Sequence, residues 1–575
     1  MAARWLVPTP DPALQDTLTR HLGITRPTAQ VLINRGLTDV DAARAFLWPQ
    51  LNNLSDPDVL PGMAEAVDRL CAAARDKERV LVYGDYDVDG TAATALLLRF
   101  FRVAGLDAEY YVPHRVDEGY GLNIAAIDEF KRRGIDLIIT VDCGVGAVEE
   151  AARIREVGLD LIVTDHHEPG EKVAAACAVV DPKLTGGLHT FRELSGVGVA
   201  FKLAWAVAKR FSPGQKMSPE FRQFLLNSLG LVALGTVADI VPLLDENRVL
   251  VSYGLKALSS APGPGLRALM DCSRVRSGQV KATDVAFGLG PRLNAAGRMA
   301  DAELAVRLML TDDGAEGQRI ASELEQHNRD RRKLQNDIFE EARQRLLSQP
   351  DLDACRAIVM ADQGWHPGVV GIVASKLVDE FHRPAAMIAL EGDIGKGSAR
   401  SVPGFNLFDA LAPFRDRMIS FGGHAAAAGF QIATGHVDEL REHLNQAAVS
   451  ADPELFQPVI DVDLEVQLAD LTERVISEFE MLRPFGQSNR QPVCAARGLH
   501  IAGRPRLMGM KGQHIAFYVT DGVTSLRTIG FGRGEELYDP ILAGQRDCSL
   551  AFAPRINTWN GSGELELRIK DLKFE

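Results

Sequence analysis

The sequence lacks the marks of a secreted, disulfide-bonded or membrane-spanning protein. Its seven cysteines are an odd number, scattered along 575 residues with no CxxC pair. Cysteines used in this way are typical of a reducing compartment and argue against a disulfide framework or a zinc ribbon. The segment Met1–Pro8 has no signal-peptide core, and no apolar run approaches the length that spans a bilayer. The sequence therefore predicts a cytoplasmic protein without a membrane segment.

An excess of positive charge is also missing. The formal net charge is −14, and the isoelectric point is about 5.5. A protein that coats duplex DNA through a generally basic surface has the opposite balance, so the composition argues against that class. A nuclease remains compatible with it, because its positive groups can be confined to one channel. A chain of 575 residues also exceeds what one hydrophobic core organises, so several domains are expected.

One short stretch, Gly84–Gly90, contains three aspartates at alternate positions. The apolar run Arg79–Tyr83 before it predicts a buried strand, and Thr91–Phe101 after it predicts a helix. Ligands bind at such strand ends in open α/β sheets, and three neighbouring carboxylates repel one another unless a cation neutralises them. An acidic solvated turn is the alternative. The apolar frame and the third aspartate favour metal ligation.

Between about 61 and 245 the chain alternates predicted strands with predicted helices such as Ile124–Arg133 and Ala147–Val157. This alternation predicts a largely parallel sheet covered by helices. The predicted strands are Val80–Tyr83, Glu109–Val112, Leu137–Val141, Leu161–Thr164 and Ala178–Val180.

Acidic and imidazole side chains come directly after several of these apolar runs. Asp142 follows Leu137–Val141, and Asp239 follows a further apolar run, Leu231–Ala238, interpreted as a strand. Because parallel strands bring their carboxyl ends to one edge, such residues converge from distant parts of the chain. Taken singly they have plain structural explanations, since Asp142 can cap a helix and His166 can be a core histidine. Their joint occurrence favours a metal site.

The predicted ligand set combines carboxylates with imidazole. It comprises Asp87, Asp89, Asp142, His166 and Asp239, with Asp85, Asp165 and His167 close by. Such ligands suit Mn²⁺ or Mg²⁺, and the histidine favours Mn²⁺. The acidic ligands are numerous enough for two ions, which together activate a water and stabilise the leaving oxygen in phosphoester hydrolysis.

Four stretches resemble the motifs of the DHH phosphoesterase family. They are Gly84–Gly90 (GDYDVDG), Thr140–Gly144 (TVDCG), Thr164–His167 (TDHH) and Gly235–Pro242 (GTVADIVP). Two further stretches, Val112–Gly121 and Gly290–Arg298, narrow the resemblance to the single-strand-specific 5′→3′ exonucleases of that family. The chain length and the order of domains fit as well. Cys143 stands where the family often has asparagine, which is expected to change hydrogen bonding slightly without loss of metal.

The resemblance implies a role for each residue of the metal site. The five ligands named above would hold two ions, with Asp142 as the bridge and a catalytic residue. His167 would face the scissile phosphate or its leaving oxygen, as a donor or general acid. Asp165 would orient a histidine from behind the ligands. Whether Asp85 is a direct ligand stays open, because only two aspartates of this motif usually reach the metal in the family.

Residues from both halves of the chain are implied to bind DNA. By the resemblance, the terminal 5′ phosphate would be bound by Arg115, Arg298, Ser398 and Arg400, and a phosphate nearer the metals by His424. Gly290–Arg298, Gly395–Ser401 and Phe421–Gly429 are interpreted as loops. In the last two, small residues would open backbone N–H groups to an anion, and arginines would add directed donors. Tight structural turns are the plain alternative. A grip on the chain terminus would explain exonuclease rather than endonuclease action.

The predicted fold class is α/β: a DHH-type parallel-sheet metal domain joined by a long helix to a second α/β domain, plus a C-terminal OB-like β-barrel. The long helix is predicted because the segment from Glu316 to Ser348 has no proline and no glycine beyond Gly317. Its basic cluster, Arg329–Lys333, is interpreted as a solvated face, and contact with DNA is the alternative. The predicted segments are a mostly helical one packed on the core (1–60), the catalytic domain (61–314), the connecting helix (315–350), the DHH-associated substrate-binding domain (351–452) and the OB-like single-strand-binding domain (453–575).

The last segment alternates short apolar runs with turns, which predicts five or six strands of a small barrel. The expected strands are Val459–Val466, Ala495–Ala502, His514–Thr520, Thr528–Phe531, Ser549–Ala553 and Glu564–Ile569. Positive and aromatic side chains suited to single-strand binding lie along the early strands: Arg504, Arg506, Lys511, His514, Phe517 and Tyr518. A plain antiparallel domain with surface charges is the alternative.

These observations and the resemblance together predict a two-metal 5′→3′ exonuclease that hydrolyses single-stranded DNA in repair and recombination. The alternative enzyme is a DHH phosphoesterase acting on short oligonucleotides, cyclic dinucleotides or pyrophosphate, although such chains usually lack the barrel and the long connector. A catalytically inactive scaffold is disfavoured because every expected ligand position is filled. Beside single-stranded DNA, a helicase and a single-strand-binding protein are candidate partners, and a monomer is the default assembly.

Overall fold

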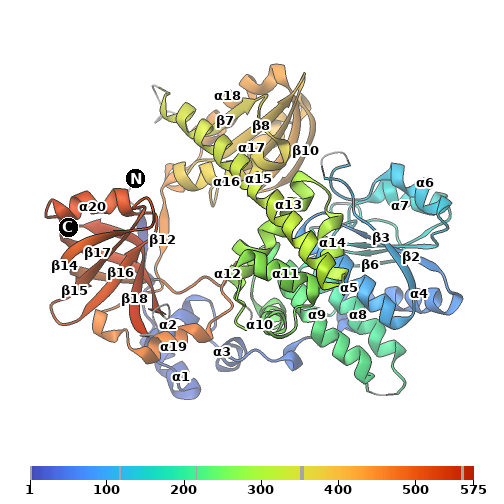
Figure 1. The fold of residues 1–575 in the computed structure, drawn as a ribbon, viewed down its shortest axis with the longest axis horizontal. Coiled ribbons are helices and arrows are strands. Elements are labelled where there is room, and N and C mark those ends of the chain that lie inside the picture. Colours follow the sequence, from blue (N-terminus) through green and yellow to red (C-terminus); the bar gives the residue numbers. More distant parts are fainter. Residues whose placement is uncertain (1–2, 116–117, 215, 277, 350–354, 558–562) are drawn as a thin grey trace. The chain divides into compact units, whose positions relative to one another are not determined.

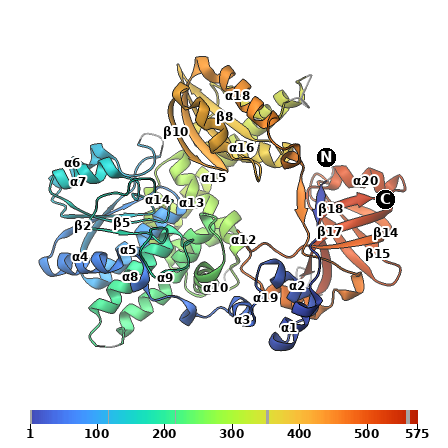
Figure 2. The same ribbon diagram turned by 180° about the vertical axis from the view of Figure 1, so that it is seen from behind.

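The computed structural model describes residues 3–115, 118–214, 216–276, 278–349, 355–557 and 563–575, and is drawn from two sides in Figures 1 and 2. The chain forms two units. The larger unit is Leu51–Phe456, and the smaller unit combines Met1–Gln50 with Gln457–Glu575. Positions 116 and 117 of the predicted stretch Val112–Gly121, and the predicted boundary at 350–351, lie outside the described residues.

The first sheet of the larger unit is parallel throughout, with strand order β3-β2-β4-β5-β6. Its strands are β2 (Arg79–Gly84), β3 (Asp107–Tyr111), β4 (Leu137–Val141), β5 (Asp160–Thr164) and β6 (Ala178–Val180). All five predicted strands are confirmed, within two residues at each end. The central strands are buried on both faces, as is typical of a parallel sheet between helix layers.

Alternate residues of β2 pack on different helix layers, one on each face of the sheet (Figure 1). Val80 and Val82 belong to one core, and Leu81 and Tyr83 to the other. The first layer contains α4 (Met63–Asp76), α5 (Val88–Ala104) and α8 (Gly196–Phe211), and the second contains α6 (Ile124–Arg132) and α7 (Val148–Glu156).

Only three residues separate β2 from helix α5, whose first turn is capped by Asp87. The Asp87 Oδ1 atom accepts hydrogen bonds from the N–H groups of Asp89 (2.8 Å) and Gly90 (3.1 Å). The helix ends at Gly105, whose φ of 74° lies in the left-handed region that glycine adopts without strain. The cap therefore places Asp89 in the first helical turn, directly beyond the strand end.

The run Leu231–Ala238, interpreted above as a strand, is helical. It forms the last part of α9 (Pro219–Ala238), and Asp239 is the residue at which that helix ends. The run is buried almost throughout, and a short run that is apolar on every side does not show the periodicity that separates a strand from a helix. Asp239 therefore comes from a helix end instead of a strand end.

Helix α9 also corrects the expectation that no apolar run approaches a membrane-spanning length. By length and composition alone its 20 residues are apolar enough to cross a membrane, with a mean hydropathy of 1.3. However, 61% of its most apolar stretch is buried inside the protein, where α9 packs on α5, α8 and α10 (Asp245–Ser260). A core helix passes the same composition test, and α9 is one.

The chain after α10 stays helical up to the connecting helix. Its elements are α11 (Pro264–Ser273), α12 (Ala282–Asp284), the π-helical η3 (Val285–Leu289), α13 (Gly290–Met299) and α14 (Glu303–Leu310). The predicted loop over Gly290–Arg298 is therefore wrong, because these residues form α13. Pro291 lies in the first turn, where a missing N–H costs little. Gly297 is required because a Cβ there would lie 2.8 Å from the Tyr86 carbonyl oxygen.

A single helix, α15 (Gly314–Leu347), joins two hydrophobic cores of the larger unit (Figure 1). Leu324, in its first half, packs in the core of the parallel-sheet domain. Ile338 and Leu346, in its second half, pack in the core of the second α/β domain. The predicted long helix is thus confirmed.

The second sheet has strand order β10-β11-β9-β8-β7, in which only β7 and β8 are parallel neighbours. Its strands are β7 (Ile358–Asp362), β8 (Ala385–Glu391), β9 (Ile394–Arg400), β10 (Met418–His424) and β11 (Ala427–Ala433). The helices of this domain are α16 (Pro367–Phe381), α17 (Leu407–Leu411) and α18 (Val437–Val449).

Two stretches interpreted above as loops are strands in this sheet. Gly395–Ser401 lies almost entirely in β9, and Phe421–Gly429 forms the hairpin of β10 and β11. Their small residues hide the apolar alternation by which a strand is recognised. At Gly397, for example, a Cβ would lie 2.2 Å from the Phe430 ring, so glycine is required there by packing on the neighbouring strand.

The C-terminal strands of the smaller unit form a closed barrel. The strand order is β13-β14-β15-β16-β18-β17, and the additional pairing of β14 with β17 closes the ring. The strands are β13 (Leu464–Glu465), β14 (Cys494–Met508), β15 (His514–Thr520), β16 (Ser525–Gly530), β17 (Asp547–Asn557) and β18 (Glu564–Phe574), accompanied by α19 (Glu473–Met481) and α20 (Gly534–Leu542). This architecture confirms the predicted OB-like barrel. Phe517, expected as a surface aromatic, is only 3% exposed and belongs to the barrel core, whereas Tyr518 is 50% exposed.

Residues 3–50 belong to this smaller unit, which corrects the prediction that the whole of 1–60 packs on the catalytic core. The end of that segment does pack there, because Leu60 lies in the core of the parallel-sheet domain and Leu51 and Leu54 pack against it. The elements within residues 3–50 are β1 (Arg4–Leu6), α1 (Pro12–Leu22), α2 (Arg26–Asn34) and α3 (Val40–Leu47). Strand β1 pairs in parallel with β12 (Val459–Asp461). Glu478 of α19 accepts hydrogen bonds from the Thr25 N–H (2.7 Å) and hydroxyl (2.6 Å), 453 residues away in sequence. No local pattern reveals partners so distant along the chain.

Replacing Glu478 with alanine is expected to destabilise the smaller unit by about 1–3 kcal/mol, because two donors of the half-buried Thr25 lose a charged acceptor. Burial alone would raise the pKa of Glu478, but the hydrogen bonds from Thr25 outweigh it and lower the pKa. The contribution is therefore present above pH about 4.3 and is lost as the pH falls below it. Urea unfolding of the variant at pH 7 and pH 3 measures both effects, and an equal loss at the two pH values would contradict this role.

Candidate active site

Three parallel strands bring their following residues to one edge of the first sheet. Gly84 at the end of β2 lies opposite Val141 of β4, and Val141 lies opposite Thr164 of β5. The residues after these strands therefore start side by side. Asp142, the first of them after β4, has a φ of 64°, a left-handed conformation that aspartate tolerates better than most residues and that is common at functional sites.

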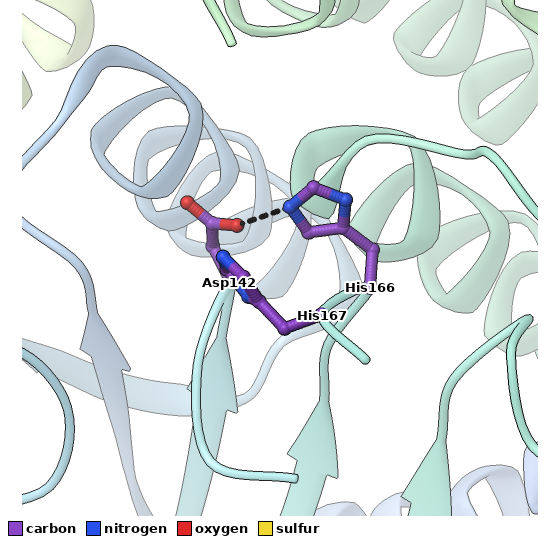
Figure 3. A group of neighbouring side chains, drawn as sticks. All are labelled: Asp142, His166 and His167. Carbon is purple, nitrogen blue, oxygen red and sulfur yellow. Dashed lines mark ion pairs between the residues drawn. The ribbon is translucent and has the colours of Figure 1, made fainter. Parts of the chain in front are cut away.

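His166 lies at the centre of the resulting cluster. Its Nε2 atom is 3.0 Å from Asp142 Oδ1, 3.6 Å from Asp239 Oδ2 and 3.9 Å from Asp89 Oδ2. Figure 3 shows the imidazole of His166 pointing at the Asp142 carboxylate, with the His167 ring lying beside it. Asp239, from the end of α9, thus reaches the same point as residues that follow β2, β4 and β5.

The candidate ligand atoms form three overlapping groups. Within each group one atom from every side chain lies within 4.8 Å of the others, and the groups are Asp142 with His166 and His167, Asp89 with His166 and Asp239, and Asp85 with Asp87 and Asp142. All five ligands predicted from the sequence belong to this cluster. Asp142 is shared between two groups, which fits a bridging role, and Asp85 lies close enough to remain a candidate ligand.

Two glycines that the sequence argument did not single out leave room for these carboxylates. A Cβ at Gly196 would lie 2.5 Å from Asp142 Oδ1, and a Cβ at Gly235 would lie 2.4 Å from Asp89 Oδ1. At the start of α8, the N–H groups of Gly196 and Val197 donate to the Asp89 carboxylate at 2.6 and 3.0 Å. The helix start thereby fixes this ligand and offers it partial positive charge.

Asp165 holds the loop that carries both histidines. Its carboxylate accepts hydrogen bonds from the N–H groups of Val145 (2.9 Å) and His166 (2.8 Å), and from His167 Nδ1 (2.7 Å). Although burial would raise it, the pKa of Asp165 is lowered by the hydrogen bond from His167. The same bond outweighs burial at His167 and raises the pKa of that imidazole. The structure thus brings Asp165 into the orienting position implied by the resemblance.

Tyr120 is a neighbour of this site that sequence reasoning missed. Its hydroxyl lies 3.0 Å from His167 Nδ1 and 3.2 Å from the Asp142 carbonyl oxygen. The Tyr120 and His167 rings meet edge to face, with centroids 5.5 Å apart. The glycines that flank Tyr120 both have positive φ, at Gly119 (84°) and Gly121 (88°), and this Gly-Tyr-Gly pattern was the available signal for a specialised turn.

Burial and mutual repulsion dominate the electrostatics of the cluster. Burial, followed by the neighbouring carboxylates, raises the pKa of Asp89 to about 7 and that of Asp239 to about 9. The same causes raise the pKa of Asp85 and Asp142 well above the usual range. Burial, with the charge of His167, lowers the pKa of His166 to about 3, so its ring is neutral at pH 7. A neutral imidazole among repelling carboxylates is a ligand set in need of cations.

Buried atoms that lack hydrogen-bond partners support the same conclusion. Among the described residues, Asp85 Oδ1, Asp142 Oδ1 and His166 Nε2 are buried atoms without a hydrogen-bond partner. Buried polar atoms normally have partners, so unsatisfied ones aimed at a common point indicate a ligand. Oxygen atoms with one imidazole nitrogen suit Mn²⁺ or Mg²⁺. The residues of this chain therefore fit the metal ions predicted from the sequence.

A second cluster consists of arginines without carboxylate partners among the described residues. The guanidinium of Arg115 lies 4.7 Å from the centre of the Tyr86 ring. Arg298 Nη1 donates to the Gly368 carbonyl oxygen (3.0 Å), and Arg400 Nη1 donates to Ser398 Oγ (2.9 Å). In these contacts the guanidinium groups meet only an aromatic ring, backbone carbonyls and a hydroxyl. The four residues predicted to bind a 5′ phosphate are Arg115, Arg298, Ser398 and Arg400.

The pKa shifts of two of these arginines indicate that the positive charges share one region. Burial, and then the charges of Arg115, Arg331 and Arg400, lowers the pKa of Arg298 to about 9. Burial and the charge of Arg115 likewise lower the pKa of Arg400. Arg331, on α15, was not predicted as part of this site. Positive charge concentrated without a counterion indicates an anion-binding pocket.

Helix α13 connects this pocket to the metal site. Asn294 of α13 accepts a hydrogen bond from the Val88 N–H (3.2 Å), next to the ligands Asp87 and Asp89. Arg298 lies one helical turn further along α13. The distance between the candidate ligands and the arginines is therefore set by a rigid helix.

Close approach of α16 to β9 positions the remaining residues of the arginine cluster. A Cβ at Gly371 would lie 2.7 Å from Ser398 Oγ and 3.1 Å from Arg400 Nη2. A Cβ at Gly368 would lie 2.7 Å from the Arg298 carbonyl oxygen. These two glycines allow the second α/β domain to contact both the arginines and α13, and the sequence alone gave no sign of which atoms approach them.

Replacing Gly371 with alanine is expected to raise KM for a 5′-phosphorylated single strand about tenfold, because the new methyl group displaces Ser398 and Arg400. Mn²⁺ affinity stays unchanged. Steady-state kinetics with metal titration measures both quantities. The matched control is Gly435→Ala, where a Cβ meets no atom within 4 Å. A Gly371→Ala protein with the control's KM would contradict the placement of the pocket.

His424, the last predicted phosphate ligand, lies in the same row of the second sheet as Arg400. His424 is paired with Ala427, and Ala427 with Arg400, so the two side chains leave the same face two strands apart. His424 is exposed, and its Nδ1 accepts a hydrogen bond from the Ala426 N–H (3.2 Å). No contact of His424 with the arginines is recorded among the described residues, so its role stays a prediction.

Three family models match the chain. The model described as the DHH family, N-terminal domain, matches residues 79–236, the DHHA1 domain matches 355–450 and the RecJ OB domain matches 462–571. These matches fall on the parallel-sheet domain, the second α/β domain and the barrel described above.

Curated relatives and solved structures match over most of the chain. The single-stranded-DNA-specific exonuclease RecJ of Bacillus subtilis is 40% identical over 99% of this chain and 70% of its own length. The RecJ of Salmonella typhimurium is 34% identical over 89% of this chain and 90% of its own length. The crystal structure of RecJ in complex with Mn²⁺ from Thermus thermophilus is 31% identical, with a TM-score of 0.84, and covers all of this chain and 80% of that one.

Proposed function

The chain belongs to the RecJ family of single-stranded-DNA-specific exonucleases, and we propose that it hydrolyses single-stranded DNA from the 5′ end with Mn²⁺ or Mg²⁺. The observation that carries this proposal is the pairing of two sites on one rigid frame. Buried carboxylates and an imidazole, whose ligand atoms lack hydrogen-bond partners, lie near Asn294 of α13. Arginines without carboxylate partners among the described residues lie near the C-terminal end of α13, where Arg298 is located.

The proposed ligands of two ions are Asp87, Asp89, Asp142, His166 and Asp239, with Asp142 as the bridge and Asp85 as a further candidate. When bound, such ions supply a water activated for attack on phosphorus and neutralise charge on the leaving oxygen. Asp89 is held for this task by the start of α8, and Asp142 by the turn after β4. These side chains are positioned before the ions bind, which limits the reorganisation that binding requires.

We infer that His167 donates a proton or a hydrogen bond to the phosphate or its leaving oxygen. Its Nδ1 is engaged by Asp165, so the opposite nitrogen, Nε2, is the one left to face the substrate. The hydrogen bond to Asp165 raises the pKa of His167 and thereby favours the protonated form that a donor needs. Asp165 acts through His167 and is a positioning residue in this account.

The arginine pocket is proposed to hold the terminal 5′ phosphate. Arg115, Arg298, Ser398 and Arg400 are its proposed ligands, since guanidinium groups bind phosphate oxygens in bidentate geometry and the Ser398 hydroxyl adjoins Arg400. His424 is proposed to contact a phosphate nearer the metal site. Because the pocket and the metal site are at a fixed separation, the bond that is cut lies at a fixed distance from the strand end. This arrangement explains exonuclease action.

The barrel is proposed to bind the single strand further along. The exposed ring of Tyr518 offers a surface for base stacking, and Arg504, Arg506 and Lys511 offer charge for the backbone. The match to the RecJ OB domain over residues 462–571 supports this part of the proposal. It also argues against the alternative of a phosphoesterase for dinucleotides or pyrophosphate, for which no barrel is needed.

In the cell we propose a role in DNA repair and recombination in the cytoplasm, as a monomer working with a helicase and a single-strand-binding protein. All seven cysteines are free thiols in the structure, which suits a reducing compartment. An exonuclease confined to single strands needs another activity to expose them, and a helicase supplies it.

The experiment that tests the proposal compares one sequence as a 5′-phosphorylated single strand and as a blunt duplex, with Mn²⁺ and with a chelator. Loss of the single strand alone, and only with metal, is the expected result. Survival of long strands while dinucleotides or pyrophosphate are hydrolysed would support the smaller-substrate alternative. Binding of the strand without hydrolysis would support an inactive scaffold.

A further inference from the structure

The inner face of α15 carries one continuous row of buried residues with apolar ends and a polar middle. In order, the row is Gly317, Ile320, Ala321, Leu324, Asn328, Arg331, Gln335, Ile338, Ala342 and Leu346. The apolar residues before Asn328 pack in the core of the parallel-sheet domain, and those after Gln335 pack in the core of the second α/β domain. The polar middle therefore lies at the junction between the two cores.

Arg331, at the centre of this polar middle, is a buried cation without a counterion. It is 7% exposed, whereas the other four residues of the basic cluster Arg329–Lys333 are exposed, as expected for a solvated face. Its guanidinium donates only to neutral amides of its own helix, Asn328 Oδ1 (2.7 Å) and Gln335 Oε1 (3.0 Å). Within the described part of the chain no carboxylate pairs with it, and its Nε atom is buried without a partner.

Burying a guanidinium without an opposite charge costs several kcal/mol, so a fold that retains one indicates an anion nearby. Burial lowers the pKa of Arg331 most, and the charges of Arg332 and Arg292 lower it further. Arg292 is itself paired with Glu325 (2.6 Å). The compensating anion of Arg331 is therefore not supplied by the described residues.

The position of Arg331 identifies where that anion would lie. Helix α15 packs on both α13 and α16, the two helices joined by the hydrogen bond from Arg298 Nη1 to the Gly368 carbonyl oxygen. Burial and the charge of Arg115 lower the pKa of Arg298 most. The charge of Arg331 lowers it further, which indicates that Arg331 is close to Arg298. Arg331 thus lies behind the arginine pocket, on the side of the connecting helix.

We propose that Arg331 is a positioning residue for the terminal 5′ phosphate, whose buried charge makes the pocket select a phosphate monoester over other strand ends. The proposal rests on the function proposed above. Because Asn328 and Gln335 hold its guanidinium, Arg331 acts through the potential at Arg298 and does not grip the strand. A terminal phosphate carries nearly two negative charges, an internal phosphodiester one and a 5′ hydroxyl none. The interaction energy scales with that charge, so one more buried cation favours the phosphorylated end most.

A purely structural explanation also exists, in which the buried polar row fixes the register of α15 between its two cores. The two explanations differ in what they predict for substrates. A residue that only fixes the helix affects every substrate alike, whereas a residue that shapes the potential changes the preference between strand ends.

The test uses the full-length protein, saturating Mn²⁺ and one single-stranded oligonucleotide with either a 5′ phosphate or a 5′ hydroxyl. Arg331→Gln is expected to raise KM for the phosphorylated strand about tenfold, with kcat and the KM for the hydroxyl strand nearly unchanged. The matched control is Arg332→Gln, the same charge change at the next residue, which is exposed. Solvent screens that charge, so the control is expected to keep the wild-type ratio of KM values.

An unchanged ratio of the two KM values in Arg331→Gln would overturn the proposal, and so would an equal rise for both strands, which supports the structural explanation. Arg331→Lys keeps the charge and covers the case in which the glutamine variant does not fold, as checked by thermal unfolding. The lysine variant is expected to keep the preference for the phosphate, and its loss in a folded protein would overturn the proposal. Wild-type protein that digests neither strand would instead refute the proposed function itself.

Discussion

Replacing Asp142 with asparagine is expected to lower kcat on single-stranded DNA by at least about a thousandfold, about 4 kcal/mol of transition-state stabilisation. Asp142 is the carboxylate shared between two groups of candidate ligands, and its Oδ1 lies 3.0 Å from His166 Nε2. Asparagine has nearly the same shape but no charge with which to bridge two cations. Steady-state kinetics under saturating Mn²⁺, with Mn²⁺ binding measured by calorimetry, separates loss of metal from loss of rate.

The matched control for this substitution is Asp128→Asn. Asp128 lies on α6 of the same domain, where it pairs with Arg153 (2.7 Å) at the surface. The same chemical change there is expected to leave kcat within a factor of about two, since exposed ion pairs contribute little. If Asp142→Asn kept more than a tenth of the wild-type kcat, Asp142 would not be the bridging ligand.

The second large effect is expected at Gly235, in the last turns of α9. Alanine there would place a Cβ 2.4 Å from Asp89 Oδ1 and 2.7 Å from Val197 Cγ1. Overpacking of this kind costs about 1–3 kcal/mol of folding free energy. It also pushes the Asp89 carboxylate away from the N–H groups of Gly196 and Val197. We therefore expect at least a tenfold loss of Mn²⁺ affinity and about a hundredfold loss of kcat.

Gly230→Ala is the matched control on the same helix. A Cβ at Gly230 would lie 3.3 Å from Leu258 Cδ2, the end of a flexible side chain that can shift. This variant is expected to bind Mn²⁺ and digest DNA like the wild type. Calorimetric Mn²⁺ titrations of both variants make the comparison, and equal affinities would show that the contact between Gly235 and Asp89 does not control the site.

The strands of the first sheet could be predicted from the sequence because each is a short apolar run bounded by turns or helices. The run Leu137–Val141 was predicted with its bounds. The convergence of Asp142 and Asp165 followed from the rule that parallel strands end at one edge. Where the local pattern and the fold agree in this way, site residues can be located without a structure.

The run before Asp239 shows where the same reasoning failed. Leu231–Ala238 is apolar on every side because it is the end of a helix buried in the core, and periodicity does not separate that case from a buried strand. The strands β9, β10 and β11 were missed for the opposite reason. Their small residues pack under neighbours such as Phe430 and show no alternation.

Long-range contacts were beyond any local pattern. The pairing of β1 with β12 and the burial of Arg331 both depend on segments distant in sequence. The need for glycine at Gly235 and Gly371 was invisible for the same reason, since the atoms that approach them, in Asp89 and Ser398, lie on other elements. A glycine in the sequence can mark a position where a side chain would not fit, but the sequence does not identify the atom with which that side chain would clash.

The central claim is that strands are cut stepwise from a 5′ end held in the arginine pocket. The most direct test is a time course with one single strand that carries different labels on its 5′-terminal and 3′-terminal nucleotides. The account predicts that the 5′ label is released at once as a mononucleotide, while the 3′ label stays on strands that shorten one nucleotide at a time. Early release of the 3′ label, or labelled internal fragments, would contradict it.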